Sequence, residues 1–90
     1  MSGPLRVVHY LNQFFGGIGG EEQADVGVTA RAGSVGPGRL LEKALGDDAR
    51  IEATLIGGDN FVNDRAEEAS RAIAVELDRL RPDVLVAGPA

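Results

Sequence analysis

Short hydrophobic runs alternate with segments of helical periodicity along the chain. Residues 5–11 are rich in β-branched and aromatic side chains, which indicates a strand. Residues 51–56 and 83–88 form two further runs, and the last of them is apolar at consecutive positions. Consecutive apolar residues are typical of parallel strands that helices cover on both faces. The pattern therefore predicts three buried strands.

Two amphipathic helices are predicted between these strands. In residues 38–45, Leu41 and Leu45 lie four positions apart and, with Leu40 and Ala44 beside them, form the buried face of a short helix. Pro37 suits the first turn of this helix, and Gly46 suits its carboxyl-terminal cap. We therefore expect the short helix to begin near the proline and to end at the glycine.

The second helix is the longest predicted element. Its apolar positions recur at spacings of three or four residues, at Ala66, Ala69, Ile73, Leu77 and Leu80. Asn60 or Asn63 can cap its start, and the sequence does not choose between them. Pro82 ends it, because the proline ring clashes with a continuing helix.

The order strand, helix, strand, helix, strand calls for right-handed crossovers and a parallel sheet. We predict one α/β domain over residues 1–90, the β-α-β-α-β portion of a flavodoxin-like sheet, incomplete on its own. A sheet of three strands has two open edges, and in this kind of fold a loop and a helix normally follow the last strand. We therefore expect a fragment, or one piece of a split or processed protein, whose remaining sheet lies elsewhere.

Residues 12–38 show no periodicity and hold eight glycines. Unstructured segments of this length are usually either functional loops or disordered. Phe14, Phe15 and Ile18 make the segment too apolar for a solvated linker. We expect part of this long glycine-rich loop to pack against another element.

Ligands of parallel sheets bind beyond the carboxyl ends of the strands. Residues 12–22, 57–63 and 88–90 lie there, and we expect them to face a common crevice. Residues 12–22 can be a ligand loop or a flexible glycine hinge. Asp59 and Asn60 can serve polar recognition or cap a helix. His9, inside the first strand, is interpreted as a hydrogen-bonded structural residue.

Two nucleotide motifs are nearly matched but fail at decisive positions. Residues 17–22 place an acidic pair where a dinucleotide fingerprint needs its third glycine, and the two carboxylates would repel a pyrophosphate. Residues 33–40 resemble a P-loop but have Arg39 for lysine and Leu40 for the Mg²⁺-binding hydroxyl. The start of that helix, with Arg39 nearby, could still hold a carboxylate, or could be a plain glycine-rich helix entry.

Composition narrows the chemistry further. The chain has no cysteine and one histidine, which excludes thiolate catalysis and a multi-histidine metal centre within it. A net charge of −5 with scattered basic residues argues against nucleic acid and anionic membranes as partners. Glu21, Glu22 and Asp25 form an acidic cluster that can act as a general base, bind an ammonium group, or simply be solvated. Without a signal peptide or an apolar span, the chain is interpreted as cytoplasmic.

Residues 7–22, VVHYLNQFFGGIGGEE, together with 33–38, 57–60 and 82–90, make the chain resemble a known family. It is similar to the N-terminus of the selenoprotein B subunits of glycine, sarcosine and betaine reductases, with the related D-proline reductase grouping. The resemblance extends in register over essentially the whole sequence. It implies a much longer protein that continues into further α/β structure.

The resemblance also implies reductive C–N cleavage of a small amino acid or amine. An amino-acid substrate would be held as a Schiff base on a pyruvoyl-bearing partner subunit, and a selenocysteine or cysteine of the B subunit would cleave the bond. This chain lacks that nucleophile, so we expect no catalytic residue and no cofactor within it. Strand-end geometry assigns substrate or partner binding to Asn12, Gln13, Phe14, Gly16, Gly17, Gly19, Gly20, Glu21, Glu22, Gly36, Gly38, Asp59 and Asn60.

Two functions remain open at this point. The chain can be part of an oxidoreductase complex, with the remainder of its polypeptide or a larger catalytic subunit as partner in a hetero-oligomer. Alternatively, it is a non-catalytic α/β module that docks to a larger subunit. A cysteine-containing continuation of the reading frame favours the first function, and a stand-alone chain favours the second.

Overall fold

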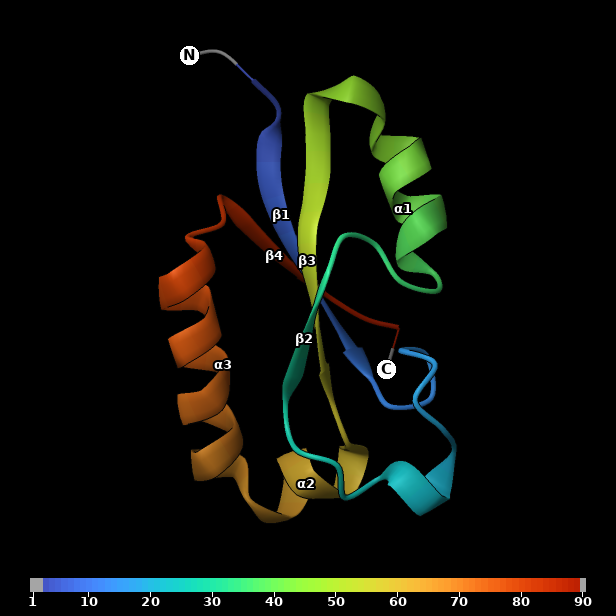
Figure 1. The fold of residues 1–90 in the computed structure, drawn as a ribbon, viewed down its shortest axis with the longest axis vertical. Helices are drawn as coiled ribbons and strands as arrows, with labels where there is room; N and C mark the ends of the chain where they lie inside the picture. Colours follow the sequence, from blue (N-terminus) through green and yellow to red (C-terminus); the bar gives the residue numbers. More distant parts are fainter. Residues whose placement is uncertain (1–2, 90) are drawn as a thin grey trace.

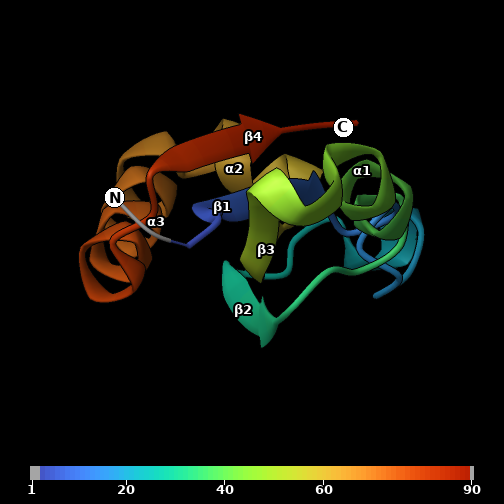
Figure 2. The same cartoon turned by 90° about the horizontal axis from the view of Figure 1, so that it is seen from above.

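The computed structural model describes residues 3–89 as a twisted sheet between helices. Its helices and strands are β1 (Leu5–Asn12), β2 (Thr29–Ala32), α1 (Gly38–Leu45), β3 (Ala49–Gly57), α2 (Asp59–Asp64), α3 (Ala66–Leu80) and β4 (Val84–Ala87). Figure 1 shows the sheet edge-on, with α1 and α3 on opposite faces. The view from above in Figure 2 shows the same layering. The predicted α/β class is confirmed.

The strands lie in the order β2-β3-β1-β4, and β1 is central. It runs parallel to both β3 and β4, as the hydrophobic runs predict. Val7, Val8 and Leu11 are almost completely buried, because helices cover both faces of this strand. Asn12 is in register with Gly57, so β1 and β3 end side by side.

The short helix α1 occupies the predicted residues. Leu41 and Leu45 pack against the core cluster formed by Val7, Ala49 and Ile51, so the predicted buried face is confirmed for these two residues. It is wrong for Leu40 and Ala44, because Leu40 is 74% exposed and Ala44 also faces solvent. Gly46 caps its carboxyl end with φ of 67°, a conformation that glycine adopts without steric penalty. The apolar spacing and the cap residue therefore defined this element correctly.

The prediction that residues 12–38 lack regular structure is wrong. Residues 29–32 form β2, which runs antiparallel to β3 and makes the sheet mixed, and residues 21–23 form one turn of 3₁₀ helix. All four residues of β2 are exposed, so no buried side chain marks the strand in the sequence. β2 also covers one of the two sheet edges that three parallel strands would leave open.

The prediction of one long helix before β4 is also inaccurate at its start. The chain forms α2 and then α3, because Arg65 leaves helical geometry at φ −129° and ψ 51°. Asn60 and Asn63 lie inside α2 and cap neither helix. At the other end, Arg81 takes a left-handed conformation directly before Pro82, which agrees with the predicted end of the helix.

No helix among residues 3–89 has the length and the apolar composition that spanning a bilayer would need.

Candidate functional site

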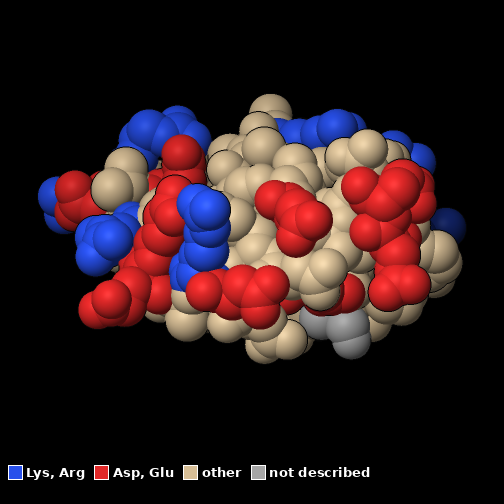
Figure 3. Space-filling model, turned by 90° about the horizontal axis from the view of Figure 1, so that it is seen from below, with Lys and Arg blue, Asp and Glu red and all other residues tan. Residues whose placement is uncertain are grey.

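The carboxyl ends of β1 and β3 lie at one end of the molecule, where α2 begins directly after β3. Figure 3 looks onto this end: acidic groups lie on uncharged surface at the centre and right, and acidic and basic side chains are mixed at the left. The predicted segments 12–22 and 57–63 do meet here, through the hydrogen bonds of residues 12, 13 and 59. Of the third predicted segment, Ala90 lies outside the described residues.

Gln13 links the two strand ends through its buried side chain. Its Oε1 accepts a hydrogen bond from the Asp59 backbone N–H at 2.9 Å, and its Nε2 donates to the Gly20 carbonyl at 3.4 Å. The residue is only 3% exposed. Because both ends of the amide are bonded within the protein, Gln13 holds the glycine loop and the start of α2 in place.

Asn12 makes a second bridge to the start of α2. Its Oδ1 accepts from the Phe15 N–H at 2.9 Å, which shapes the turn that follows β1. Its Nδ2 donates to Oδ2 of Asp59 at 3.2 Å. Asp59 itself is exposed, so the site presents a carboxylate that Asn12 orients, on a backbone that Gln13 holds.

The glycine loop folds back on the end of β1. The backbone N–H groups of Ile18 and Gly19 donate to the Gln13 carbonyl at 3.0 and 3.2 Å. Gly16 packs so closely against Ile56 that a Cβ there would lie 2.8 Å from its side chain, and Gly17 has φ of 77°. Phe14 projects from this loop with 64% of its surface exposed.

The acidic pair lies in the short helical turn beyond the glycines. Glu22 accepts a hydrogen bond from the Gly20 N–H at 2.9 Å. This bond and one from its own backbone N–H lower the pKa of the Glu22 carboxyl below its ordinary value. Glu21 and Asp25 are exposed. Glu22 thus has a structural role in the turn, while its neighbours face solvent.

Gly36 and Gly38 lie at the start of α1, and Gly36 also contacts the loop that follows β1. Gly36 packs against the Phe15 carbonyl, and Gly38 packs against Nδ1 of His9. The N–H groups of Gly38 and Arg39 donate to Val35 and Gly36, inside their own turn. These first helical N–H groups are therefore already bonded, as a glycine-rich helix entry requires.

His9 is 1% exposed, and its Nε2 lies 2.6 Å from the Gly88 carbonyl. A carbonyl can only accept, so Nε2 donates this hydrogen bond. Within the described residues, Nδ1 has no hydrogen-bond partner. The interpretation of His9 as a hydrogen-bonded structural residue is confirmed, and the bond ties β1 to the segment after β4.

Asn60 is exposed on α2, while its backbone N–H donates to the Ala24 carbonyl at 2.8 Å. Its side chain lines an open hollow of about 520 Å³ together with Asp25, Phe61, Asp64 and Arg65. The hollow therefore combines residues from the acidic loop and from α2. Within residues 3–89, no three metal-ligating side chains come together.

Tyr10 belongs to this site, and sequence reasoning missed it. A Cβ on Gly57 would lie 2.6 Å from the Tyr10 hydroxyl oxygen, so the glycine makes room for that hydroxyl. Burial, and to a smaller extent the charge of Asp59, raises the pKa of Tyr10 above its ordinary value of 10.0. The signal was present in the sequence, because Tyr10 and Asn12 are two apart and share a strand face.

A family model described as glycine/sarcosine/betaine reductase selenoprotein B matches residues 4–90. The glycine reductase complex component B subunit gamma of Symbiobacterium thermophilum is 54% identical over 86 residues, which are 96% of this chain and 20% of that protein. The sarcosine reductase complex component B subunit beta of Peptoclostridium acidaminophilum is 46% identical with the same coverage. No solved structure matches the chain significantly.

The betaine reductase complex component B subunit beta of Peptoclostridium acidaminophilum is 39% identical over 85 residues, or 94% of this chain and 19% of that protein. The chain therefore spans about a fifth of the length of these relatives. The family match covers nearly every residue, so the resemblance predicted from the sequence is confirmed. The chain belongs to the glycine/sarcosine/betaine reductase selenoprotein B family.

Proposed function

We propose that this chain is the N-terminal part of a reductase B-component subunit, whose strand-end loops help bind a small amino acid or amine derivative. The names of its relatives include glycine, sarcosine and betaine reductase complexes, which supports an oxidoreductase assembly of several subunits. The chain has no thiol, so the cysteine or selenocysteine that cleaves the C–N bond belongs to another segment or chain. The pyruvoyl group implied by the family belongs to a partner subunit in the same proposal.

The observation that carries this proposal is the fixed and exposed carboxylate of Asp59. Its backbone N–H is bonded to Gln13 and its Oδ2 to Asn12. Its Oδ1 has no hydrogen bond within residues 3–89 and remains available to a ligand. A carboxylate held in this way suits an ammonium group, because charge-assisted hydrogen bonds are roughly twice as strong as neutral ones.

The remaining candidate residues divide by exposure into two roles. Asn12 and Gln13 are buried and position the loops around Asp59. Phe14, Glu21 and Asn60 are exposed and face the substrate or a partner subunit.

A flavodoxin-like arrangement of the complete domain is part of the proposal. The parallel strands follow one another in the spatial order β3-β1-β4, with the first strand in the middle and helices on both faces. This is how the doubly wound order 2-1-3-4-5 begins. In such folds the ligand crevice lies at the point where the strand order reverses, which here is the carboxyl end of β1.

The test is a chimera in which these 90 residues replace the matching 86 residues of the Symbiobacterium thermophilum subunit, assembled in its B complex. Asp59→Asn removes the charge and keeps the shape. We expect the KM for glycine to rise about tenfold or more with little change in kcat, since the carboxylate binds the substrate and does not react. Asp48→Asn, an exposed acid directly before β3 and so at the opposite end of that strand, is the control and should leave KM unchanged.

A second function, a non-catalytic assembly module, is favoured by the exposed apolar residues Val84 and Leu85 of β4. If Asp59→Asn leaves the KM of an assembled chimera unchanged, the substrate-binding proposal fails. The assembly function would then become the preferred one.

A further inference from the structure

The two outer strands of the sheet have different edges. β2 presents Arg31 among short and exposed side chains, which is a usual protection of an edge strand against further pairing. β4 has the sequence VLVA, without charge, proline or bulge. It pairs only with β1, and among residues 3–89 no strand occupies its other edge. β4 therefore has the composition of an interior strand at an edge position.

Both faces of β4 are incompletely covered. Val86 packs against the core cluster of Val7 and Ile51 on the α1 side, but Val84 on the same face is 41% exposed. Leu85 points to the opposite face, toward α3, and is 44% exposed. Strands of parallel sheets are normally covered on both faces, so each face of β4 lacks part of its cover.

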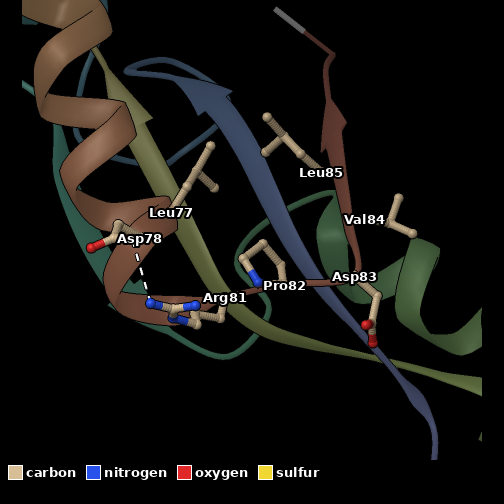
Figure 4. Close-up of a pocket in the computed structure, with 7 residues that line it drawn as sticks. All are labelled: Leu77, Asp78, Arg81, Pro82, Asp83, Val84 and Leu85. Atoms are coloured by element: carbon tan, nitrogen blue, oxygen red, sulfur yellow. Dashed lines mark ion pairs between the residues drawn. The ribbon is translucent and has the colours of Figure 1, made fainter.

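A hollow of about 440 Å³ lies between β4 and the end of α3, lined by Leu77, Asp78, Arg81, Pro82, Asp83, Val84 and Leu85. Figure 4 shows Leu77 and Leu85 pointing toward one another across it. The Asp78–Arg81 ion pair, at 3.7 Å, lies at its rim. An apolar floor with a charged rim suits a hydrophobic side chain of a packed neighbouring element.

We propose that the free edge of β4 pairs with a parallel strand from the part of a B-component subunit outside these 90 residues. An element connected to that strand then fills the hollow between Leu77 and Leu85. This inference rests on the proposed function, in which the chain is one part of such a subunit. The curated relatives are about five times longer than the matched region. Their remaining residues are therefore numerous enough to form the additional strand and the element that covers it.

A second copy of this chain fits the edge less well. Two-fold symmetric pairing of β4 with itself is antiparallel, and the strand has only four residues. Such a short pairing buries little surface, which is less than a stable dimer of two unlinked copies needs. The structure therefore favours the remaining subunit as the occupant.

Thiol labelling tests this directly, because the chain has no cysteine of its own. Leu85→Cys places a thiol on β4, and Leu40→Cys places a control thiol on α1, where Leu40 is 74% exposed. Maleimide labelling is followed by peptide mass spectrometry in the 90-residue chain and in the Symbiobacterium chimera. We expect the β4 thiol to react at least tenfold more slowly in the chimera, while the α1 thiol reacts at the same rate in both.

Equal labelling of the β4 thiol in the two proteins would overturn the proposal. Protection that is already present in the 90-residue chain and is lost on dilution would identify a second copy as the occupant and overturn it too. Hydrogen exchange of residues 82–89 in the unsubstituted proteins gives a second readout that does not depend on how Leu85→Cys folds, and exchange should slow in the chimera. Neither measurement uses activity, so a failed KM prediction for Asp59→Asn leaves this result interpretable.

Discussion

Gln13 joins the end of β1, the glycine loop and the start of α2 through one buried amide. Gln13→Ala leaves the Asp59 N–H and the Gly20 carbonyl without this partner. Both bonds are partly buried, and the Gly20 carbonyl keeps the bond from the Gln23 N–H. A hydrogen bond contributes about 0.5–1.5 kcal/mol net, so the loss of two should lower the free energy of unfolding by about 1–3 kcal/mol. Urea denaturation measures it. Gln23→Ala removes the same side chain from an exposed position and should change stability by no more than about 0.5 kcal/mol.

Tyr10 gives a direct spectroscopic measurement of the strand-end site, because it is the only tyrosine and the chain has no tryptophan. Burial first, and the charge of Asp59 second, raise its pKa above 10.0. Titration of the tyrosinate absorbance should therefore give a midpoint above the ordinary value. Asp59→Asn should lower that midpoint only in part, since burial remains. A midpoint at the ordinary value in the folded protein would contradict the described position of Tyr10.

The same group links stability to pH. Above the pKa of the unfolded chain, near 10, the unfolded state releases the tyrosine proton while the folded state retains it. The contribution of Tyr10 is therefore fully present below that pH and is lost as the pH rises through the folded pKa. Urea denaturation at pH values from 8 to about 11 should show this decline, and Tyr10→Phe should reduce it.

At the scale of elements, Gly58 allows the loop before β2 to pack against the start of α2. A Cβ at Gly58 would lie 2.3 Å from the Ala24 carbonyl oxygen, an atom of the backbone. Gly58→Ala should therefore destabilise the protein by about 1–3 kcal/mol, as overpacking does. Gly27→Ala is the control, because its Cβ would meet only Phe61 at 3.9 Å. Thermal unfolding distinguishes the two variants, and equal midpoints would contradict the close packing at Gly58.

The end of α3 offers a substitution of opposite sign. Arg81 has φ of 49°, a left-handed conformation that glycine adopts more readily than arginine. Arg81→Gly should raise the free energy of unfolding by about 0.5–1 kcal/mol. Arg71→Gly, in the exposed middle of α3, should lower it by about 1 kcal/mol. Urea denaturation of both variants tests the cap, and a loss of stability in both would show that residue 81 does not act as one.

The elements that could be predicted are those whose hydrophobic spacing reports burial. β1, β3 and α1 each bury apolar residues at strand or helix positions, and their residue ranges follow from that spacing. β2 is held by backbone hydrogen bonds and by Thr54, whose hydroxyl donates to the Gly33 carbonyl at 2.8 Å. Such hydrogen bonds cannot be predicted from the spacing of hydrophobic residues. The break at Arg65 is equally invisible, because apolar periodicity does not depend on one residue's backbone angles.

At the scale of the whole molecule, the predicted strand order locates the site more reliably than sequence motifs do. The meeting of Asn12 with Asp59 follows from parallel pairing of β1 with β3, which the sequence predicts. The burial of Asn12 and Gln13 did not follow, because their partners lie about 46 residues away or in a loop without periodicity. Tyr10 could be placed on the strand face of Asn12 from the sequence, but only the folded chain shows that Gly57 lies beside its hydroxyl.

The order of the strands also determines where the sheet should open first. β1 and β3 each have a neighbour on both sides, whereas β2 and β4 have one. Amides of the inner strands should exchange only through global unfolding, while the outer strands fray locally. Hydrogen exchange of the 90-residue chain should therefore be at least about tenfold faster in residues 29–32 and 84–87 than in 5–12 and 49–57, a difference of about 1.4 kcal/mol in opening free energy.

The two outer strands provide each other's control in this measurement. If the free edge of β4 is where further structure pairs, exchange in residues 84–87 should slow in the Symbiobacterium chimera, while residues 29–32 keep the rate of the 90-residue chain. Residues 84–87 exchanging as slowly as β1 in the isolated chain would contradict the strand order. Slower exchange of both outer strands in the chimera would instead show that the added structure stabilises the whole sheet. Pairing at β4 alone would not slow the local opening of β2, because the two strands are not neighbours.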